Sequence, residues 1–383
     1  MKVLAVTSSF PRFRGDYHGS FIHELCERLA FSGVEVTVVA PRSRSTTGAD
    51  TAFTVKRFPF MPSQGIETLP EQTMKYASFS GAMQLPMYLS AAYLSLVKEP
   101  TQIVHAHFTF PMGFLAAMSP RSTPLLITCH GSDCTLPYAK PEYRLLARIA
   151  LKKADRVVAV SEFIKGLAID LGARREKTEV IYTGIDVEKF RPPGDRRRLQ
   201  VEFGIPAGRQ VVGTLGRLVP EKRVEDFIRA ASMIGNKGDF QFIVGGEGSS
   251  RTHLERLSKE LKVDNISFLG EVSDAVRFHQ LCDIFVLTSI REGLSVSLQE
   301  AMSTGNVPVA VNGYGNPEII TDGENGYLFE PMDVQGLTEK IVLAVDSPEL
   351  GRRARSTMTD RFDSRKNVGR YIELYEELTS PKR

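Results

Sequence analysis

Several features that mark other classes of protein are missing from this sequence of 383 residues. No apolar run approaches the roughly 20 residues that a membrane-spanning helix needs, so none is expected. The first glycine-containing turn lacks the pattern G-x-G-x-x-G, which disfavours a dehydrogenase. The net charge of +3 is too small to imply nucleic acid as a partner.

Metal-ligating residues are also scarce. The four cysteines lie far apart except for Cys129 and Cys134, and this pair has no neighbours at zinc-site spacing. His105 and His107 alternate along a predicted strand and face one side of it, but no third ligand accompanies them. We therefore expect free, mostly buried thiols and no metal site.

The N-terminal residues and the chain length indicate where the protein is located and how many domains it has. The opening MKVLAVTSSF has one lysine and a short β-branched run that meets Pro11, which predicts a buried first strand and not a signal peptide. We expect the chain to stay in the cytoplasm. At roughly 150 residues per domain, two domains of similar size are the simplest interpretation.

Short β-branched runs alternate with helical patterns, as in parallel sheets with crossover helices. The first series is VLAVTS, VEVTVVAP, IVHAHF, PLLITCHG and RVVAVS; the second is QVVGTLGRL, FQFIVGGEG, ISFLGEV, DIFVLTS, VPVAVN and GYLFEP. We predict an α/β protein with two Rossmann-like, doubly wound domains facing a central cleft. Open α/β sheets bind ligands at the carboxyl ends of their strands, so chemistry is expected in the turns that follow strands.

A segment with paired prolines and a basic run, EVIYTGIDVEKFRPPGDRRRLQ, is typical of an exposed hinge between compact units. We place the domain boundary there, with residues 1–190 in one domain and 191–363 in the other. Apolar residues at helical spacing predict an amphipathic helix over 364–383, and its apolar stripe must pack on another element.

The turn after DIFVLTS is the first candidate site. In IREGLSVSLQEAMSTG, Gly293 and Ser295 suit the start of a helix. Backbone N–H groups from Leu294 to Ser297, at the positive end of the helix dipole, would then bind an anionic diphosphate.

Two carboxylates flank this turn. Glu292 precedes the helix, and Glu300 lies roughly two turns inside it. The two carboxylates can therefore reach different parts of one ligand, one its reacting end and the other a more distant hydroxyl. Taken by themselves, such residues are more often solvated helix carboxylates. The same gap separates Glu27 from Glu35 by accident, so the setting and not the spacing carries the interpretation.

The second candidate is GRLVPEKR, which follows the strand VVGTL. Gly216 permits close approach of a ligand. Arg217, with its planar bidentate guanidinium, and Lys222, with its mobile ammonium charge, would together bind a phosphate. An ordinary basic surface turn is the alternative. Nearby, FIVGGEGSS is a weak dinucleotide-like turn, and the backbone at Val272 either meets a base edge or simply ends a strand.

In the first half, the strand LLITC ends in His130, Gly131, Ser132 and Asp133. A lone histidine is more often structural, but its position at a strand's carboxyl end favours a functional role. The long first turn, FPRFRGDYHGSFIHELCERL, offers Gly15, Asp16, His18 and Gly19 as a frame for a second substrate. A flexible surface loop is the competing interpretation.

Taken together, these turns resemble the GT4-type family of retaining glycosyltransferases with the two-domain GT-B architecture, over nearly the whole chain. EGLSVSLQEAMSTGNVPVAVNGYGNPEIITDGENGYLFEP resembles its Glu-x7-Glu signature and the segments after it, and GRLVPEKR its phosphate-clamp loop. HAHFTFPMGF, HGSD, ADRVVAVSEFIK and YTGIDVEKFRP resemble its N-domain and linker motifs. The first domain would then bind the acceptor, the second the nucleotide-sugar donor, and the terminal helix would cross back onto the first.

The resemblance also implies roles for single residues. Glu292 would contact donor-sugar hydroxyls, Glu300 the ribose, Arg217 with Lys222 the diphosphate, and His130 would lie near the transferred sugar. The resemblance also implies that the donor site includes Gly216, Val272, Gly293, Leu294, Ser295 and Val296. The acceptor side would include Gly15, Asp16, Gly19 and Asp133.

The sequence departs from the family pattern at two places, which bear on the identity of the acceptor and the contacts to the sugar and not on the reaction class. RGDYHGS stands in place of the usual double-glycine acceptor loop. The common GGxPE run reads GYGNPE, with Tyr314 and Asn316 in altered places.

The expected reaction is transfer from a UDP- or GDP-linked sugar to a hydroxyl of a lipid-linked or cell-surface saccharide. A metal-dependent transferase would be expected to carry an Asp-x-Asp triplet, and none occurs. Basic side chains and a helix dipole would then stabilise the leaving group in place of a metal ion, and no cofactor is expected. The basic and apolar stretch from Arg42 to Leu96 is either a docking surface for an anionic inner leaflet or a partly exposed helical excursion. The alternatives are an epimerase of the same architecture, a phosphorylase with a pyridoxal lysine, and a non-catalytic nucleotide-sugar-binding protein.

Overall fold

The computed structural model describes residues 1–13, 16, 18–42, 46, 51–59, 79–120, 122–206, 208–235, 239–290 and 292–380, without the side chains of 79–84 and 139. Gly15 and much of the predicted docking stretch lie outside the described residues. The chain forms two compact units, Met1–Tyr182 with Arg365–Arg383, and Thr183–Ser364. Residue 190, where the boundary was predicted, lies inside the second unit.

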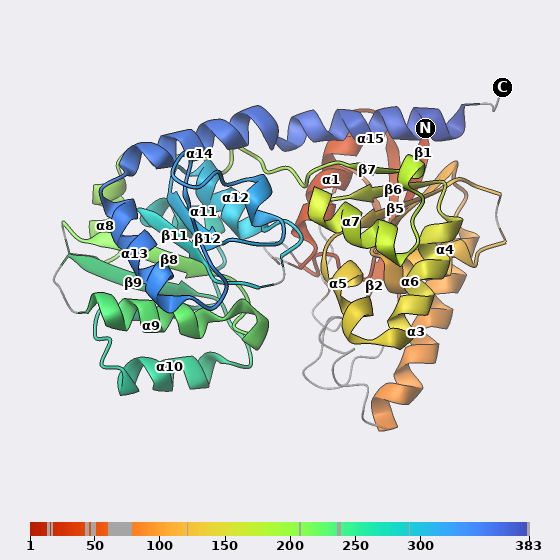
Figure 1. Ribbon diagram of the computed structural model, residues 1–383. Coiled ribbons are helices and arrows are strands. Elements are labelled where there is room, and N and C mark those ends of the chain that lie inside the picture. Colours follow the sequence, from red (N-terminus) through yellow and green to blue (C-terminus); the bar gives the residue numbers. More distant parts are fainter. Residues whose placement is uncertain are drawn as a thin grey trace. The chain divides into compact units, whose positions relative to one another are not determined.

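The first unit contains a seven-stranded parallel sheet in the order β3-β2-β1-β4-β5-β6-β7 (Figure 1). The strands are β1 (Lys2–Val6), β2 (Glu35–Pro41), β3 (Thr54–Phe58), β4 (Ile103–His107), β5 (Leu125–Cys129), β6 (Arg156–Ala159) and β7 (Thr178–Val180). Its helices are α1 (Ser20–Phe31), α3 (Phe79–Lys98), η1 (Thr109–Gly113), α4 (Phe114–Ala117), α5 (Ser132–Ala139), α6 (Pro141–Lys153), α7 (Glu162–Leu171), η2 (Arg175–Lys177) and α15 (Ser364–Thr379).

The two edge strands of this sheet, β3 and β7, were not predicted. Strands β4 and β5 are buried at every position, so each appears in the sequence as a continuous apolar run. In contrast, β3 reads TVKRF and is only partly buried, and β7 has three residues at the start of the supposed hinge. The hinge segment therefore begins inside the first sheet.

The terminal helix α15 completes the core of the first unit. Its apolar stripe of Val368, Tyr371, Leu374 and Tyr375 packs in one cluster with residues of α1 and of the central strands. The hydroxyl of Tyr375 also bonds His105 Nδ1 on β4 at 2.7 Å. An element from the far end of the chain is thus part of the first hydrophobic core.

The second unit contains a six-stranded parallel sheet in the order β10-β9-β8-β11-β12-β13. The strands are β8 (Gln210–Leu215), β9 (Phe240–Gly245), β10 (Ile266–Gly270), β11 (Ile284–Leu287), β12 (Val307–Val311) and β13 (Tyr327–Phe329). The helices are α8 (Arg196–Glu202), η3 (Pro220–Lys222), α9 (Val224–Ile234), α10 (Arg251–Glu260), α11 (Ala275–Leu281), α12 (Val296–Ser303), η4 (Asn316–Glu318), α13 (Val334–Val345) and α14 (Pro348–Arg361).

Each strand order reverses direction once, and this defines where ligands bind. In the first unit the reversal falls between β1 and β4, and in the second between β8 and β11. At such a switch point the connections leave the sheet toward opposite faces, so a crevice opens at the carboxyl ends of the two strands. The prediction of two doubly wound α/β domains is confirmed.

Candidate functional site

The loops that follow β8 and β11 are joined at the switch point of the second unit. The Thr288 hydroxyl donates to the carbonyl of Lys222 at 2.7 Å, and the Ile290 amide donates to the carbonyl of Glu221 at 3.3 Å. These bonds fix the short helix η3 against the start of the loop that leads to α12. Lys222 and Glu292 are thereby held close together.

Lys222 and Glu292 form an ion pair, in which Lys222 Nζ bonds Glu292 Oε1. Their side chains are 26% and 15% exposed, so the pair is largely shielded from solvent. Burial opposes the charge on Glu292, but Lys222, a hydrogen bond from Ser289 and the nearby Arg217 outweigh it and hold the pKa of that carboxyl below its usual value. Glu292 is therefore an ionised carboxylate at neutral pH.

Arg217 supplies the second cation at this point. It lies near enough to Glu292 to lower the pKa of that carboxyl. Within the described part of the chain, no acceptor bonds its guanidinium. Its guanidinium is thus available to an anion, whereas the ammonium group of Lys222 is already paired with Glu292.

The loop from Gly216 to Val219 is held by the glycine-rich turn after β9. The Leu218 amide donates to Glu247 O and the Ser250 amide to Leu218 O, both at 2.8 Å. The tight approach falls on Gly246, with φ 121°, where a Cβ would overlap the carbonyl oxygen of Gly216. A Cβ on Gly216 would meet no atom within 4 Å. The glycine that the packing requires is therefore Gly246, and the weak GGEG pattern has a structural function.

Helix α12 begins where the sequence predicted. The Ser295 hydroxyl caps it by accepting the N–H of Leu298 at 3.3 Å. No described residue accepts the amides of Val296 and Ser297, the first two of the helix, which remain available to an anion. Leu294 is buried below them.

Gly293 lies under a second loop, after β12. The Gly315 amide donates to Glu292 O at 3.3 Å, and a Cβ on Gly315 would overlap Gly293 O. In this altered GYGNPE segment Tyr314 has a positive φ of 59°, while Asn316 is buried and donates to Val311 O at 3.1 Å. The segment thus forms a close-packed wall behind Glu292.

Glu300 lies in the second turn of α12, closer to the helix start than predicted. One of its oxygens bonds the ring of His279, Nε2 to Oε2 at 3.1 Å. His279 is fully buried on α11, and sequence reasoning missed it because one histidine inside an amphipathic helix carries no motif. Val272 follows β10 and lies close to Gly245 at the end of β9.

In the first unit, two histidines meet beside the switch point. His107 ends β4 and His130 follows β5, and since these strands are neighbours, His107 Nδ1 bonds His130 Nε2 at 3.0 Å. Phe21 and Phe108 each lie 4.9 Å from the His130 ring. Burial lowers the pKa of His107 to about 3, and burial with the neighbouring His107 holds the pKa of His130 well below its usual value, so both rings are neutral.

The carboxylate of Asp133, which was predicted on the acceptor side, binds backbone amides of its own loop and of the segment that follows β4. Asp133 is 8% exposed, and its oxygens accept the amides of Thr109, His130 and Gly131 at 2.9 to 3.0 Å. The sulfur atoms of Cys129 and Cys134 and a carboxylate oxygen of Asp133 all lie within 4.8 Å of one another. The hydrogen bond between the two thiols lowers the pKa of Cys129 and raises that of Cys134, and burial raises both, so that the pKa of each thiol lies above its usual value. The cluster therefore consists of protonated thiols beside the Asp133 side chain, which shapes the His130 loop.

Asp16 is likewise bound within its own loop. Its carboxylate accepts Arg12 Nε at 2.6 Å and contacts His18 Nδ1 at 2.7 Å. Burial opposes this charge, but the bonds from His18 and Arg12 hold the pKa of Asp16 far below its usual value. Gly19 starts α1 with φ 66°, and a Cβ there would overlap Ser9 O.

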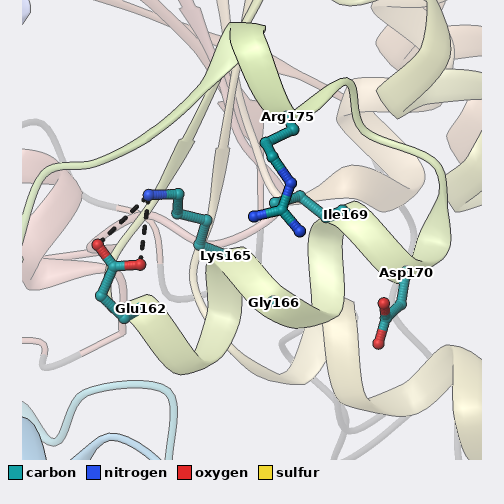
Figure 2. Close-up of a pocket in the computed structure, with 6 residues that line it drawn as sticks. All are labelled: Glu162, Lys165, Gly166, Ile169, Asp170 and Arg175. Carbon is teal, nitrogen blue, oxygen red and sulfur yellow. Dashed lines mark hydrogen bonds and ion pairs between the residues drawn. The ribbon is translucent and has the colours of Figure 1, made fainter.

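A cavity of about 200 Å³ lies away from these residues in the first unit (Figure 2). It is lined by Glu162, Lys165, Gly166, Ile169, Asp170 and Arg175, from α7 and η2. Lys165 is paired with Glu162 at 3.3 Å. None of the predicted site residues that the structure describes lines this cavity.

The two halves of the chain match two families. Residues 195–361 match Glycosyl transferases group 1, and residues 18–189 match Glycosyltransferase Family 4. The chain therefore belongs to the family 4, group 1 glycosyltransferases, and its two parallel-sheet units are those of the GT-B architecture. It is a glycosyltransferase.

Relatives with assigned activities are 27% identical to this chain over the parts that align. N-acetyl-alpha-D-glucosaminyl L-malate synthase of Bacillus anthracis is 27% identical, over 73% of this chain and 76% of that protein. UDP-Gal:alpha-D-GlcNAc-diphosphoundecaprenol alpha-1,3-galactosyltransferase of Escherichia coli is also 27% identical, over 77% and 80%.

A solved structure supports the fold alone. Anabaena Alr3699/HepE in complex with UDP-glucose matches with a TM-score of 0.80 at 21% identity, over 98% of this chain and 100% of that one. Among the described residues, none of the helices has the length and apolar character that crossing a bilayer requires.

Proposed function

We propose that this chain transfers a sugar, with retention of the anomeric configuration, from a UDP- or GDP-linked donor to a hydroxyl of a lipid-linked or cell-surface saccharide. The observation that carries the proposal is the group of Lys222, Glu292 and Arg217 beside the capped start of α12. Two cations and free helix amides suit a diphosphate, and an ionised carboxylate beside them suits sugar hydroxyls. UDP is the favoured nucleotide, because the names of the E. coli relative and of the HepE complex include it.

In this reaction the second unit would stabilise the leaving group. As the bond between the anomeric carbon and the phosphate oxygen breaks, negative charge develops on the nucleoside diphosphate. Arg217, Lys222 and the amides of Val296 and Ser297 would neutralise it without a metal ion.

Retention without a covalent glycosyl-enzyme intermediate requires attack on the face from which the nucleotide leaves. The acceptor oxygen bonds the anomeric carbon through an oxocarbenium-like state, and its proton passes to the departing phosphate oxygen. Glu292 would bind the sugar hydroxyls through hydrogen bonds, and this course of reaction needs no covalent nucleophile from the protein.

The acceptor is assigned to the first unit, whose charge suits an anionic partner. Residues 1–182 and 365–383 hold 26 basic and 18 acidic side chains, against 22 and 27 in residues 183–364. A diphosphate-linked lipid acceptor, of the kind named for the E. coli relative, is anionic and lies in a membrane. We therefore propose peripheral docking on an anionic inner leaflet.

Product analysis tests the reaction. The protein is incubated with UDP- or GDP-sugars and a diphosphate-lipid saccharide, and NMR of the product gives the anomeric configuration. An inverted centre contradicts retention. Nucleotide-sugar conversion without acceptor indicates the epimerase instead, and binding without turnover indicates the non-catalytic protein.

Docking is tested separately by co-sedimentation with liposomes of neutral or anionic lipid. Binding that rises with the anionic fraction and falls with salt supports it. Equal binding to both kinds of liposome contradicts the membrane part of the proposal and leaves the transfer reaction untouched.

A further inference from the structure

Behind the proposed ribose contact lies a histidine that the sequence did not single out. His279 is fully buried, and its Nε2 lies 3.1 Å from Oε2 of Glu300, which is 16% exposed. A buried ring thus holds one oxygen of a carboxylate that reaches the surface. No described residue bonds the other oxygen, Oε1.

Aromatic neighbours fix the ring of His279. Phe285 and Phe278 pack edge-on against it, with ring centroids at 5.1 and 5.7 Å. Asn306 donates its side-chain amide to the carbonyl of His279 at 2.9 Å, which anchors the end of α11. The ring therefore has a single orientation relative to Glu300.

The surroundings also fix the tautomer. Nε2 must carry the proton, because the carboxylate of Glu300 only accepts. Nδ1 is buried, and no described residue offers it a partner. A bare acceptor there costs less than an orphaned N–H, which favours the ring with its proton on Nε2 alone.

We propose that His279 is a positioning residue that fixes Oε2 of Glu300 so that Oε1 faces the ribose hydroxyls of the donor nucleotide. This inference rests on the proposed function. A free glutamate samples many rotamers, and ordering them on binding lowers affinity. His279 removes that ordering step and makes the site selective for ribose.

The test compares UDP with 2′,3′-dideoxyuridine diphosphate by calorimetry on the full chain. Wild type is expected to prefer UDP by about tenfold or more, the value of a hydrogen bond to a charged group. His279→Phe should reduce this ratio to about twofold, since Glu300 is no longer held. In His279→Gln the side-chain amide can donate to Glu300 from the position of Nε2, so the preference for UDP over the dideoxy nucleotide should remain close to that of the wild type.

Two further variants guard against a folding artefact. His279→Asn keeps a polar side chain too short to reach Glu300 and should behave like the phenylalanine variant. His253→Gln, on the exposed histidine of α10, should behave like wild type. A merely structural His279 would change the melting temperature and leave the UDP to dideoxy ratio alone, which would overturn the inference.

Nitrogen NMR gives a second readout that needs no ligand. Two-bond proton–nitrogen correlations in the wild type should show His279 protonated at Nε2, and the Nδ1–H form would overturn the proposal. Failure of the wild type to bind UDP or GDP overturns the proposed function as well. Normal UDP binding with an unchanged ratio in His279→Phe overturns the role of His279 alone.

Discussion

Lys222 and Glu292, both assigned to the donor, are bonded to each other across a sequence separation of 70 residues. A diphosphate that binds Lys222 must therefore compete with the Glu292 carboxylate. We expect the pair to hold each group in place and to lower the affinity for a nucleotide that offers no sugar to Glu292.

Glu292→Gln removes this competition. We expect UDP or GDP alone to bind several-fold more tightly, because Lys222 is freed, while turnover falls about a hundredfold or more since the sugar loses a charged partner. Calorimetry and initial rates measure the two effects, with Glu260→Gln on the exposed face of α10 as control. Weaker nucleotide binding in Glu292→Gln would contradict the competition.

The clamp is tested by removing each cation. Arg217→Ala and Lys222→Ala should each lower kcat/KM by about a hundred- to a thousandfold, the usual cost of losing one preorganised charge-stabilising group. Arg229→Ala, at an exposed position of α9, should change it little. Normal turnover in Arg217→Ala would remove Arg217 from the mechanism.

Two glycines provide a matched pair for the clamp loop. Gly246→Ala should destabilise the fold by about 1–3 kcal/mol, since φ 121° strains a side chain and the new Cβ meets Gly216 O. Gly216→Ala has open space and should change the free energy of unfolding by less than about 0.5 kcal/mol. Urea denaturation measures both, and equal effects would contradict the assigned packing.

The loop that carries Asp16 predicts a pH dependence. The pKa of Asp16 lies far below its usual value, so its ionised form stabilises the fold above about pH 4, and this contribution is lost as pH falls toward the folded pKa. Asp16→Asn should cost about 1–3 kcal/mol at pH 7, with the difference shrinking between about pH 4 and pH 2. Denaturation at a series of pH values checks this, and a pH-independent difference would show that shape and not charge matters.

Docking of α15 depends partly on one buried hydroxyl. Tyr375→Phe leaves His105 Nδ1 without its bond and should cost about 1–2 kcal/mol in free energy of unfolding. Tyr138→Phe, where the tyrosine is 47% exposed, is the control and should cost much less. A neutral Tyr375→Phe would mean that apolar packing alone holds the helix.

The central strands and the start of α12 could be predicted because their signals are local. Strands such as β4 and β5, buried on both faces, need unbroken apolar runs, and Ser295 caps a helix through its own next turn. The edge strands β3 and β7 could not, because one is half exposed and the other has three residues, so neither needs an apolar run.

By itself, therefore, the sequence determined the two α/β series, the turns that carry chemistry and the residue types within them. Only the tertiary structure decided which groups meet. Strand order brings Lys222 to Glu292 and His107 to His130, turns Asp133 toward backbone amides, and places His279 behind Glu300. Such contacts depend on which strands are neighbours and where their loops return, and no periodicity along the chain encodes that.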